Sequence, residues 1–238
     1  MKLLITTLIL LFGNNLYAQV ADGLDKQTNL NELGREGNTG IVRTYDNRYI
    51  GVKGSPFFIN DWHNGTVYLE NGKIFENVPL KIDVYQNELL AISRGQTIYV
   101  TKDQVNNFLL QPDSLEEPIK FINIKSSQYK KFDEDQFLRV LHEGTKTVLE
   151  WHQKYYSEAD YTGAYSANRT YDEFIQSSKF YYMDEKDQLK KLRTSIGKIA
   201  KIFESNEKAV KDFIFENNLN PKQPAQLARI LRYGESLP

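Results

Sequence analysis

Residues 62–101 read WHNGTVYLENGKIFENVPLKIDVYQNELLAISRGQTIYVT. Four short runs in this stretch alternate apolar and polar residues, and Asn71-Gly72, Gln86-Asn87 and Arg94-Gly95 separate them. An Asn-Gly pair between two alternating runs is typical of a type I′ hairpin turn, whose two central residues both need φ > 0. The pattern therefore predicts a ribbon of antiparallel strands at the centre of the protein.

More strands are predicted on both sides of this ribbon. Before it, YDNRYIGVKGSPFFINDW (residues 45–62) predicts a short strand, a glycine turn and a second strand that begins after Pro56, where a missing N–H costs little. After it, VNNFLL, IKFINI and, further along, KFYYM have the residue types of strands.

The run FLRVLHEGTKTVLEWH (residues 137–152) has two interpretations. It is either a hairpin that turns at Glu143-Gly144, or partly helical, because Phe137, Val140 and Leu141 stand at helical spacing. Gly144 and the β-branched residues around it favour the hairpin.

The pattern changes to helix from residue 187. Ser195 and Asn206 are placed to cap two helices, and a third helix follows Pro224. The sequence thus predicts one α+β domain over residues 45–238. A strand-rich body (45–183) carries a C-terminal helical cluster (187–237), which we expect to cover one face or edge of the sheet.

The amino-terminal residues predict export. Lys2, the apolar run LLITTLILLF and Ala18 match a secretory signal peptide over residues 1–18; an uncleaved anchor is the alternative. No cysteine stands near the cut, which excludes a lipid-anchored lipoprotein. Residues 19–44 are polar and rich in glycine and predict a flexible lead-in. We expect a location in the periplasm, on the outer-membrane surface or outside the cell, with no transmembrane segment after signal cleavage.

The composition of the chain excludes several classes of catalytic and binding site. The chain has no cysteine, which excludes thiol nucleophiles and thiolate metal sites, and its net charge of −1 gives no reason to expect a nucleic-acid partner. In the predicted hairpin, His142 and His152 lie too far apart to share a zinc ion, and His63 with Asn64-Gly65 is expected in a turn. Neither GxSxG, HExxH nor a glycine-rich nucleotide loop occurs. No catalytic residue, metal or cofactor is predicted.

The best candidate for a binding site is the loop SEADYTGAYSANRTYDEF, residues 157–174. Flat tyrosine rings among small polar residues are typical of binding loops, because they give contact area at low entropic cost. The alternative is a flap whose tyrosines pack back onto the sheet. The predicted binding residues are Asp160, Tyr161, Tyr165, Arg169, Tyr171 and Asp172.

Four segments together resemble a family of uncharacterised exported proteins of Bacteroidota: DNRYIGVKGSPFFINDWHNG, LENGKIFENVPLKIDVYQNELL, FLRVLHEGTKTVLEW and ADYTGAYSANRTYDEF. The resemblance extends from about residue 45 to the C-terminus. It implies a location in the envelope of a Gram-negative cell, and it supplies no catalytic residue.

These observations favour a non-enzymatic binding or structural role toward an unknown envelope protein or glycan. The alternative is a cell-envelope hydrolase that acts on glycan or peptide through loop carboxylates such as Asp160, Asp172 and Glu173. A third possibility is attachment to a membrane partner through an apolar stripe left exposed on residues 223–237.

Overall fold

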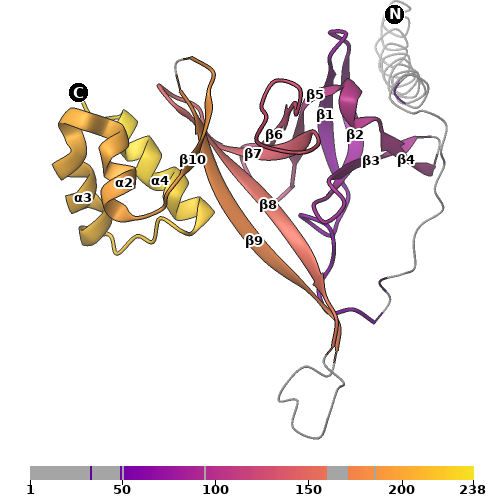
Figure 1. The fold of residues 1–238 in the computed structure, drawn as a ribbon. Helices are drawn as coiled ribbons and strands as arrows, with labels where there is room; N and C mark the ends of the chain where they lie inside the picture. The colour runs from indigo at the N-terminus through magenta and orange to yellow at the C-terminus, as the bar shows by residue number, and fades with distance from the viewer. Residues whose placement is uncertain (1–32, 34–48, 50, 94, 160–170, 185) are drawn as a thin grey trace, which may run out of the picture.

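The structure is a computed structural model that describes residues 33, 49, 51–93, 95–159, 171–184 and 186–238. Ten strands form one antiparallel sheet, in the spatial order β10-β9-β8-β7-β6-β5-β1-β2-β3-β4 (Figure 1). The strands are β1 (His63–Leu69), β2 (Ile74–Asp83), β3 (Glu88–Ser93), β4 (Gln96–Val100), β5 (Val105–Gln111), β6 (Ile119–Ile124), β7 (Gln136–His142), β8 (Thr147–Ser157), β9 (Glu173–Met183) and β10 (Leu189–Leu192). The predicted α+β class is confirmed: one sheet and one C-terminal group of helices.

The predicted antiparallel ribbon is confirmed as strands β1 to β4. Its predicted central position is wrong, because these four strands form one end of the sheet with β4 at the edge. Its first turn is also not of type I′. Gly72 has φ 83°, whereas Asn71 is not among the residues with positive φ. The Leu69 N–H donates to the Lys73 carbonyl, and the Gly72 N–H donates back to Leu69. The Asn71 side chain accepts the Lys73 N–H at 3.1 Å. The turn therefore needs a left-handed conformation at the glycine alone.

The prediction of a turn at His63 and Asn64-Gly65 is wrong, because these residues begin strand β1. Gly65 is required there by close packing: a Cβ at this position would lie 2.2 Å from the Leu109 carbonyl oxygen on β5. A glycine inside a strand thus marks a close approach of two backbones and not a chain reversal.

The strand predicted after Pro56 is also not formed. The strand predicted before it falls on residues 45–50, of which the structure describes only Tyr49. Gly51 and Gly54 adopt φ of 87° and 85°, which interrupts any extended run. The segment instead makes two isolated bridges, Lys53 to Glu173 on β9 and Phe57 to Asp83 on β2. It therefore joins the end of β2 to the end of β9 and does not form a hairpin of its own.

Strands β5 and β6 and the hairpin of β7 and β8 lie where the sequence predicted them, and the helical alternative for residues 137–152 is excluded. Strands β8 and β9, however, are longer than predicted. The pairing runs residue by residue from Thr147 with Met183 to Ser157 with Glu173, so residues 157, 173 and 174 of the predicted loop are strand.

The outer half of this pair is named the arm, residues 151–157 of β8 and 173–179 of β9. Strand β7 pairs with β8 only as far as Glu150, and β10 pairs with β9 only from Phe180 onward. The arm therefore extends beyond its neighbouring strands, and Figure 1 shows it running away from the helices as a two-stranded ribbon.

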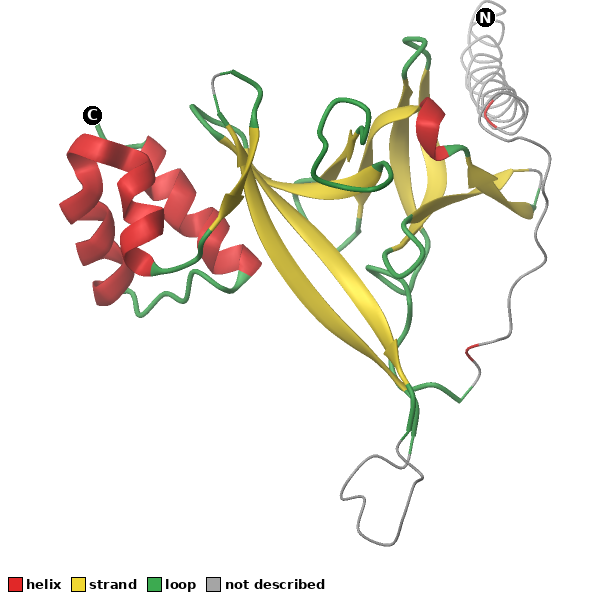
Figure 2. Cartoon of the chain, in the orientation of Figure 1, coloured by secondary structure: helices red, strands yellow, loops and turns green. Residues whose placement is uncertain are grey.

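The C-terminal helices are α2 (Ile196–Ala200), the 3₁₀ helix η3 (Lys201–Asn206), α3 (Glu207–Glu216) and α4 (Pro224–Glu235), and Figure 2 shows them grouped at one end of the molecule. A further 3₁₀ helix, η2 (Lys102–Gln104), lies between β4 and β5. Ser195, Asn206 and Pro224 stand at the starts of α2, α3 and α4 as predicted, but the side chains of Ser195 and Asn206 make no capping hydrogen bond. The short strand β10 within residues 187–195 was not predicted.

Apolar residues of these helices cover one face of β7 to β10 and form a cluster with Leu141, Val148, Phe180 and Leu192. Leu227, Ile230 and Leu231 of α4 are buried in it. An exposed apolar stripe on residues 223–237 is therefore not present, which contradicts the possibility of membrane-partner attachment through that stripe.

A second and larger cluster lies among β1 to β7 and includes Phe75, Phe108, Phe121 and Phe137. Leu33 is fully buried in it; the rest of the predicted signal peptide and lead-in lies outside the described residues. A third cluster, around Phe132, Leu149 and Tyr181, covers the other face of the β7–β9 region. Within the described ranges, no helix has the length and apolarity required to cross a membrane.

Candidate functional site

Four of the six predicted binding residues, Asp160, Tyr161, Tyr165 and Arg169, lie outside the described residues. The other two, Tyr171 and Asp172, lie at the end of the arm. The Tyr171 hydroxyl accepts a hydrogen bond from Lys53 Nζ at 2.9 Å, and the lysine also lies over the tyrosine ring. Because Lys53 comes from the segment before β1, this contact ties that segment to the arm.

The Asp172 carboxylate closes the end of the arm. It accepts hydrogen bonds from the Tyr156 hydroxyl at 2.6 Å and from the Ala159 N–H at 2.7 Å. These bonds lower the pKa of Asp172, and the bond from Tyr156 to the carboxylate raises the pKa of that tyrosine to about 12. A general acid needs the opposite shift. The geometry thus makes Asp172 an ionised acceptor that fixes the strand ends.

Aromatic rings pack together on one side of the arm end. Phe174 contacts Tyr49 at 5.1 Å, Tyr85 at 5.4 Å and Tyr156 at 5.8 Å between ring centroids, in edge-to-face arrangements. Such pairs are favourable beyond the area they bury. This arm-end cluster joins β8, β9, the turn after β2 and the segment before β1, so the arm end is held by four parts of the chain.

The same region carries several exposed large hydrophobic residues. Seven large hydrophobic residues are exposed among the described ones, and four belong to the arm end: Tyr85 (39%), Tyr155 (43%), Tyr171 (38%) and Ile175 (44%). Tyr155 and Ile175 are direct partners across β8 and β9. Exposed apolar residues that gather in one place mark interaction sites more often than scattered ones do.

A buried polar network lies at the root of the arm. The Glu150 side chain on β8 is fully buried, and its carboxylate accepts a hydrogen bond from the Ser178 hydroxyl of β9 at 2.6 Å. His152 Nδ1 lies 3.1 Å from the same carboxylate, and Arg139 of β7 lies 3.4 Å from its other oxygen. The network therefore links three adjacent strands where β7 leaves β8.

This network was missed in the sequence. The available signal was that Val148, Glu150 and His152 occupy alternate positions of one strand and so share a face that must be buried near its start. A carboxylate in that row needs internal partners.

The geometry of the network is not that of a Ser/His/acid relay. In such a relay the serine bonds one ring nitrogen and the carboxylate the other. Here both the Ser178 hydroxyl and His152 Nδ1 contact the Glu150 carboxylate. His152 Nε2 is buried and has no hydrogen-bond partner among the residues that the structure describes. Burial raises the pKa of Glu150, and the hydrogen bonds from His152 and Ser178 with the charge of Arg139 outweigh it, so the net pKa shift is downward. Glu150 is thus a buried, compensated anion.

A second buried carboxylate, Asp83, ends strand β2. Burial raises its pKa to about 6, although the N–H groups of Gln86 and Tyr85 donate to it and Lys154 contributes a positive charge. Lys154 lies on the arm and donates to the Phe57 carbonyl. Asp83 and Lys154 therefore place opposite charges between the body of the sheet and the arm.

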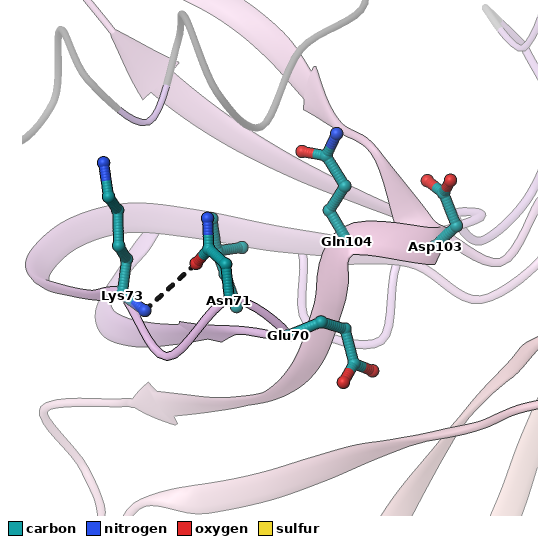
Figure 3. Close-up of a pocket in the computed structure, with 6 residues that line it drawn as sticks. Glu70, Asn71, Lys73, Asp103 and Gln104 are labelled. Carbon is teal, nitrogen blue, oxygen red and sulfur yellow. Dashed lines mark hydrogen bonds between the residues drawn. The ribbon is translucent and has the colours of Figure 1, made fainter.

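A shallow groove of about 490 Å³ lies by the turn between β1 and β2 (Figure 3). Figure 3 shows Lys73, Gln104 and Asp103 pointing to one side and Glu70 to the other. The Glu70 carboxylate lies 3.2 Å from Lys125 Nζ. These side chains do not converge on a common point, so the groove has no arrangement suited to acid–base chemistry. In the described part of the chain, no three His, Asp or Glu side chains are grouped as metal ligands.

No protein-family model matches the chain. A search of curated proteins found no match. A search of solved structures found none either.

Proposed function

We propose that this chain is an exported, non-enzymatic binding protein. Its contact surface is the outer end of the arm, the end that lies farthest from the helices. The observation that carries the proposal is the exposed pair Tyr155 and Ile175, which are direct partners across β8 and β9. They lie on the face of the arm opposite Tyr156 and Phe174. A surface of this kind loses unfavourable contact with water when a partner covers it.

The arm end also has the rigidity that a binding surface needs. The arm-end cluster, the Asp172 hydrogen bonds and the bridge from Lys53 to Glu173 hold its strands in one arrangement. A rigid surface loses little conformational entropy on binding, so more of the contact energy remains as affinity. The flap alternative concerns the tyrosines of residues 157–174, of which only Tyr171 is described. Tyr155 and Ile175 remain available to a partner.

The location of this function is proposed from residues 1–18, whose charge and apolar run match a signal peptide. The partner is accordingly an envelope protein or an envelope glycan. Tyrosine rings serve both classes, because they combine an apolar face with a hydroxyl.

The proposal is tested by changing the exposed pair without touching the buried rings. The variant Tyr155→Ser with Ile175→Thr keeps strand-compatible residues and removes the apolar surface. Phe215→Ser is the matched control, because Phe215 is 67% exposed on helix α3, away from the arm.

Each protein is immobilised, and envelope extract bound to it is quantified by mass spectrometry. We expect molecules enriched on the wild type to be lost from the arm variant and retained by Phe215→Ser. Equal recovery on all three proteins would contradict a contact surface at the arm.

The alternative is a hydrolase that acts through the carboxylates of residues 157–174. Asp172 gives it no support, because the lowered pKa and two hydrogen bonds of this residue hold it as a structural anion. Asp160 lies outside the described residues.

A further inference from the structure

Part of the outer edge of strand β9, on the side away from β8, is an unpaired strand edge. This stretch is called the place below, because a further strand could pair there. At one end of it Lys53 bridges to Glu173, and at the other end β10 pairs with β9 from Phe180 onward. Between them, residues 174–179 have no strand beside them within the described ranges. Six residues correspond to about 20 Å of extended chain.

The hydrogen bonds at Lys53 show which backbone groups point to this edge. The Lys53 N–H donates to the Asp172 carbonyl at 2.8 Å, and the Phe174 N–H donates to the Lys53 carbonyl at 3.0 Å. Since N–H and C=O groups of alternate residues point to the same side of a strand, those of Gln176 and Ser178 also point outward. Gln176 is exposed. The edge therefore offers two donors and at least two acceptors in the spacing of a strand ladder.

The charges at the β10 end of this open edge are positive, whereas Asp172 and Glu173 lie at its other end. Residues 188–203 contain five Lys or Arg and no Asp or Glu. Lys191 lies on β10, opposite Tyr181, and Arg193 follows the last β10 residue. Both are exposed, and within the described part of the chain neither has an ion-pair partner. Lys179, the last residue of the place, lies over the Trp151 ring and 3.4 Å from the Gln153 side chain.

We infer that the outer edge of β9 binds an extended acidic peptide segment of a partner protein, which adds to the sheet as a further strand of about six residues. Backbone pairing with Gln176 and Ser178 holds the peptide, its acidic side chains lie near Lys179, Lys191 and Arg193, and Ile175 contacts an apolar side chain of the peptide. This inference rests on the proposed function, because it assigns the mode of binding to the same arm.

A separate peptide fits this edge better than a second copy of the chain. The β9 strand of a second copy carries its own β10 beside residues 180–183, and its own Lys53 bridge beside residue 173. Placing two such edges side by side brings these neighbours into the same space at both ends. A single extended segment has no such neighbours.

Gln176→Pro tests the backbone pairing. Proline removes an N–H that points to the open edge, which an edge strand tolerates, and leaves the β8 hydrogen bonds in place. Gln176→Ala is the matched control, since it removes the same side chain and keeps the N–H. Lys191→Glu with Arg193→Glu tests the charge.

The probe is a phage-displayed library of random eight-residue peptides, selected on the full wild-type chain. We expect the selected peptides to be rich in Asp and Glu. Their affinity should be kept by Gln176→Ala and fall by about 10-fold or more for Gln176→Pro and for the double charge variant. Far-ultraviolet circular dichroism checks the fold of each variant.

Equal binding to Gln176→Pro and Gln176→Ala would overturn the strand addition, and so would a selection that yields no acidic peptides. Dimers of the wild type in sedimentation that Gln176→Pro dissociates would assign the edge to a second copy and overturn the peptide. The double variant Tyr155→Ser with Ile175→Thr could lose its envelope partners while Gln176→Pro keeps them. That result would support the proposed function and overturn the strand addition.

Discussion

At the residue scale, Asp83 has an unusual effect on stability. Its pKa rises from 3.8 to about 6 in the folded protein, chiefly through burial. Between these values the folded state holds more protons than the unfolded one, so this residue lowers stability as pH rises from about 4 to 6. The shift of about two pH units already includes the opposing charge of Lys154 and corresponds to an upper limit of about 3 kcal/mol.

The variant Asp83→Asn should therefore be more stable than the wild type at pH 7, by about 1–2 kcal/mol. Asparagine still accepts the N–H groups of Tyr85 and Gln86 but carries no charge to bury. Urea unfolding at pH 4 and pH 7 measures the difference. Asp184→Asn is the control of opposite sign, because the hydrogen bond from Lys190 lowers the pKa of Asp184 to about 2. A wild type that is as stable as Asp83→Asn at pH 7 would contradict the account of Asp83.

Glu150 has the opposite effect on the pH dependence of stability, because its pKa is lowered in the folded protein. Its contribution to stability is present above the unfolded pKa, near 4.5, and is lost as pH falls through the folded value. Glu150→Gln should destabilise the protein by about 1–3 kcal/mol at pH 7, because Arg139 and His152 lose their anion in a buried place.

A double-mutant cycle with Arg139→Gln measures this coupling by urea unfolding. The account expects the double variant to lose less stability than the sum of the two single losses. Additive losses would show that the 3.4 Å contact between Arg139 and Glu150 contributes nothing.

At the scale of elements, two glycines in the helical cluster make a matched pair. A Cβ at Gly234 of α4 would meet the Phe203 ring at 2.5 Å, whereas a Cβ at Gly197 of α2 would meet nothing within 4 Å. Alanine favours the helix at both positions by about 1 kcal/mol. Gly197→Ala should therefore raise the free energy of unfolding, and Gly234→Ala should lower it by about 1–3 kcal/mol. Thermal melts compare the two variants, and the same sign for both would contradict this packing.

The elements that the sequence predicted well are those whose signals are local. The turns at Gly72, Asn87 and Gly95 use positive φ at a Gly or Asn, and helices begin at residues suited to caps. The errors have a different cause. Asn64-Gly65 resembles a turn, yet its glycine serves the approach of the Leu109 carbonyl. Such a long-range reason cannot be read from neighbouring residues.

The candidate site was predictable only in part. The tyrosine content of residues 157–174 indicated the arm end, and Tyr171 and Asp172 do lie there. The neighbours Tyr49, Tyr85 and Phe174 come from three separate segments, which topology alone brings together. The length of the arm was missed because Tyr, Gln and Ser in β8 and β9 show no apolar alternation where both faces meet water.

At the scale of the whole molecule, stability should be uneven. The centre of the sheet has partners on both sides of each strand, whereas the arm is a ribbon of two strands. Amides of Ile175 and Ser177, which pair with β8, should exchange with solvent at a lower free energy of opening than those of Val67 in β1. Native-state hydrogen exchange measures both. Equal protection of arm and centre would show that the arm is held by more than the arm-end cluster.

The central claim is that the free end of the arm meets a partner. It is tested most directly by placing the photo-crosslinking residue benzoylphenylalanine at position 155 or at position 215 and irradiating intact cells. The account predicts a crosslinked product of defined mass from Tyr155 and none from Phe215, although Phe215 is the more exposed of the two. Crosslinking at both positions alike, or at position 215 alone, would contradict it.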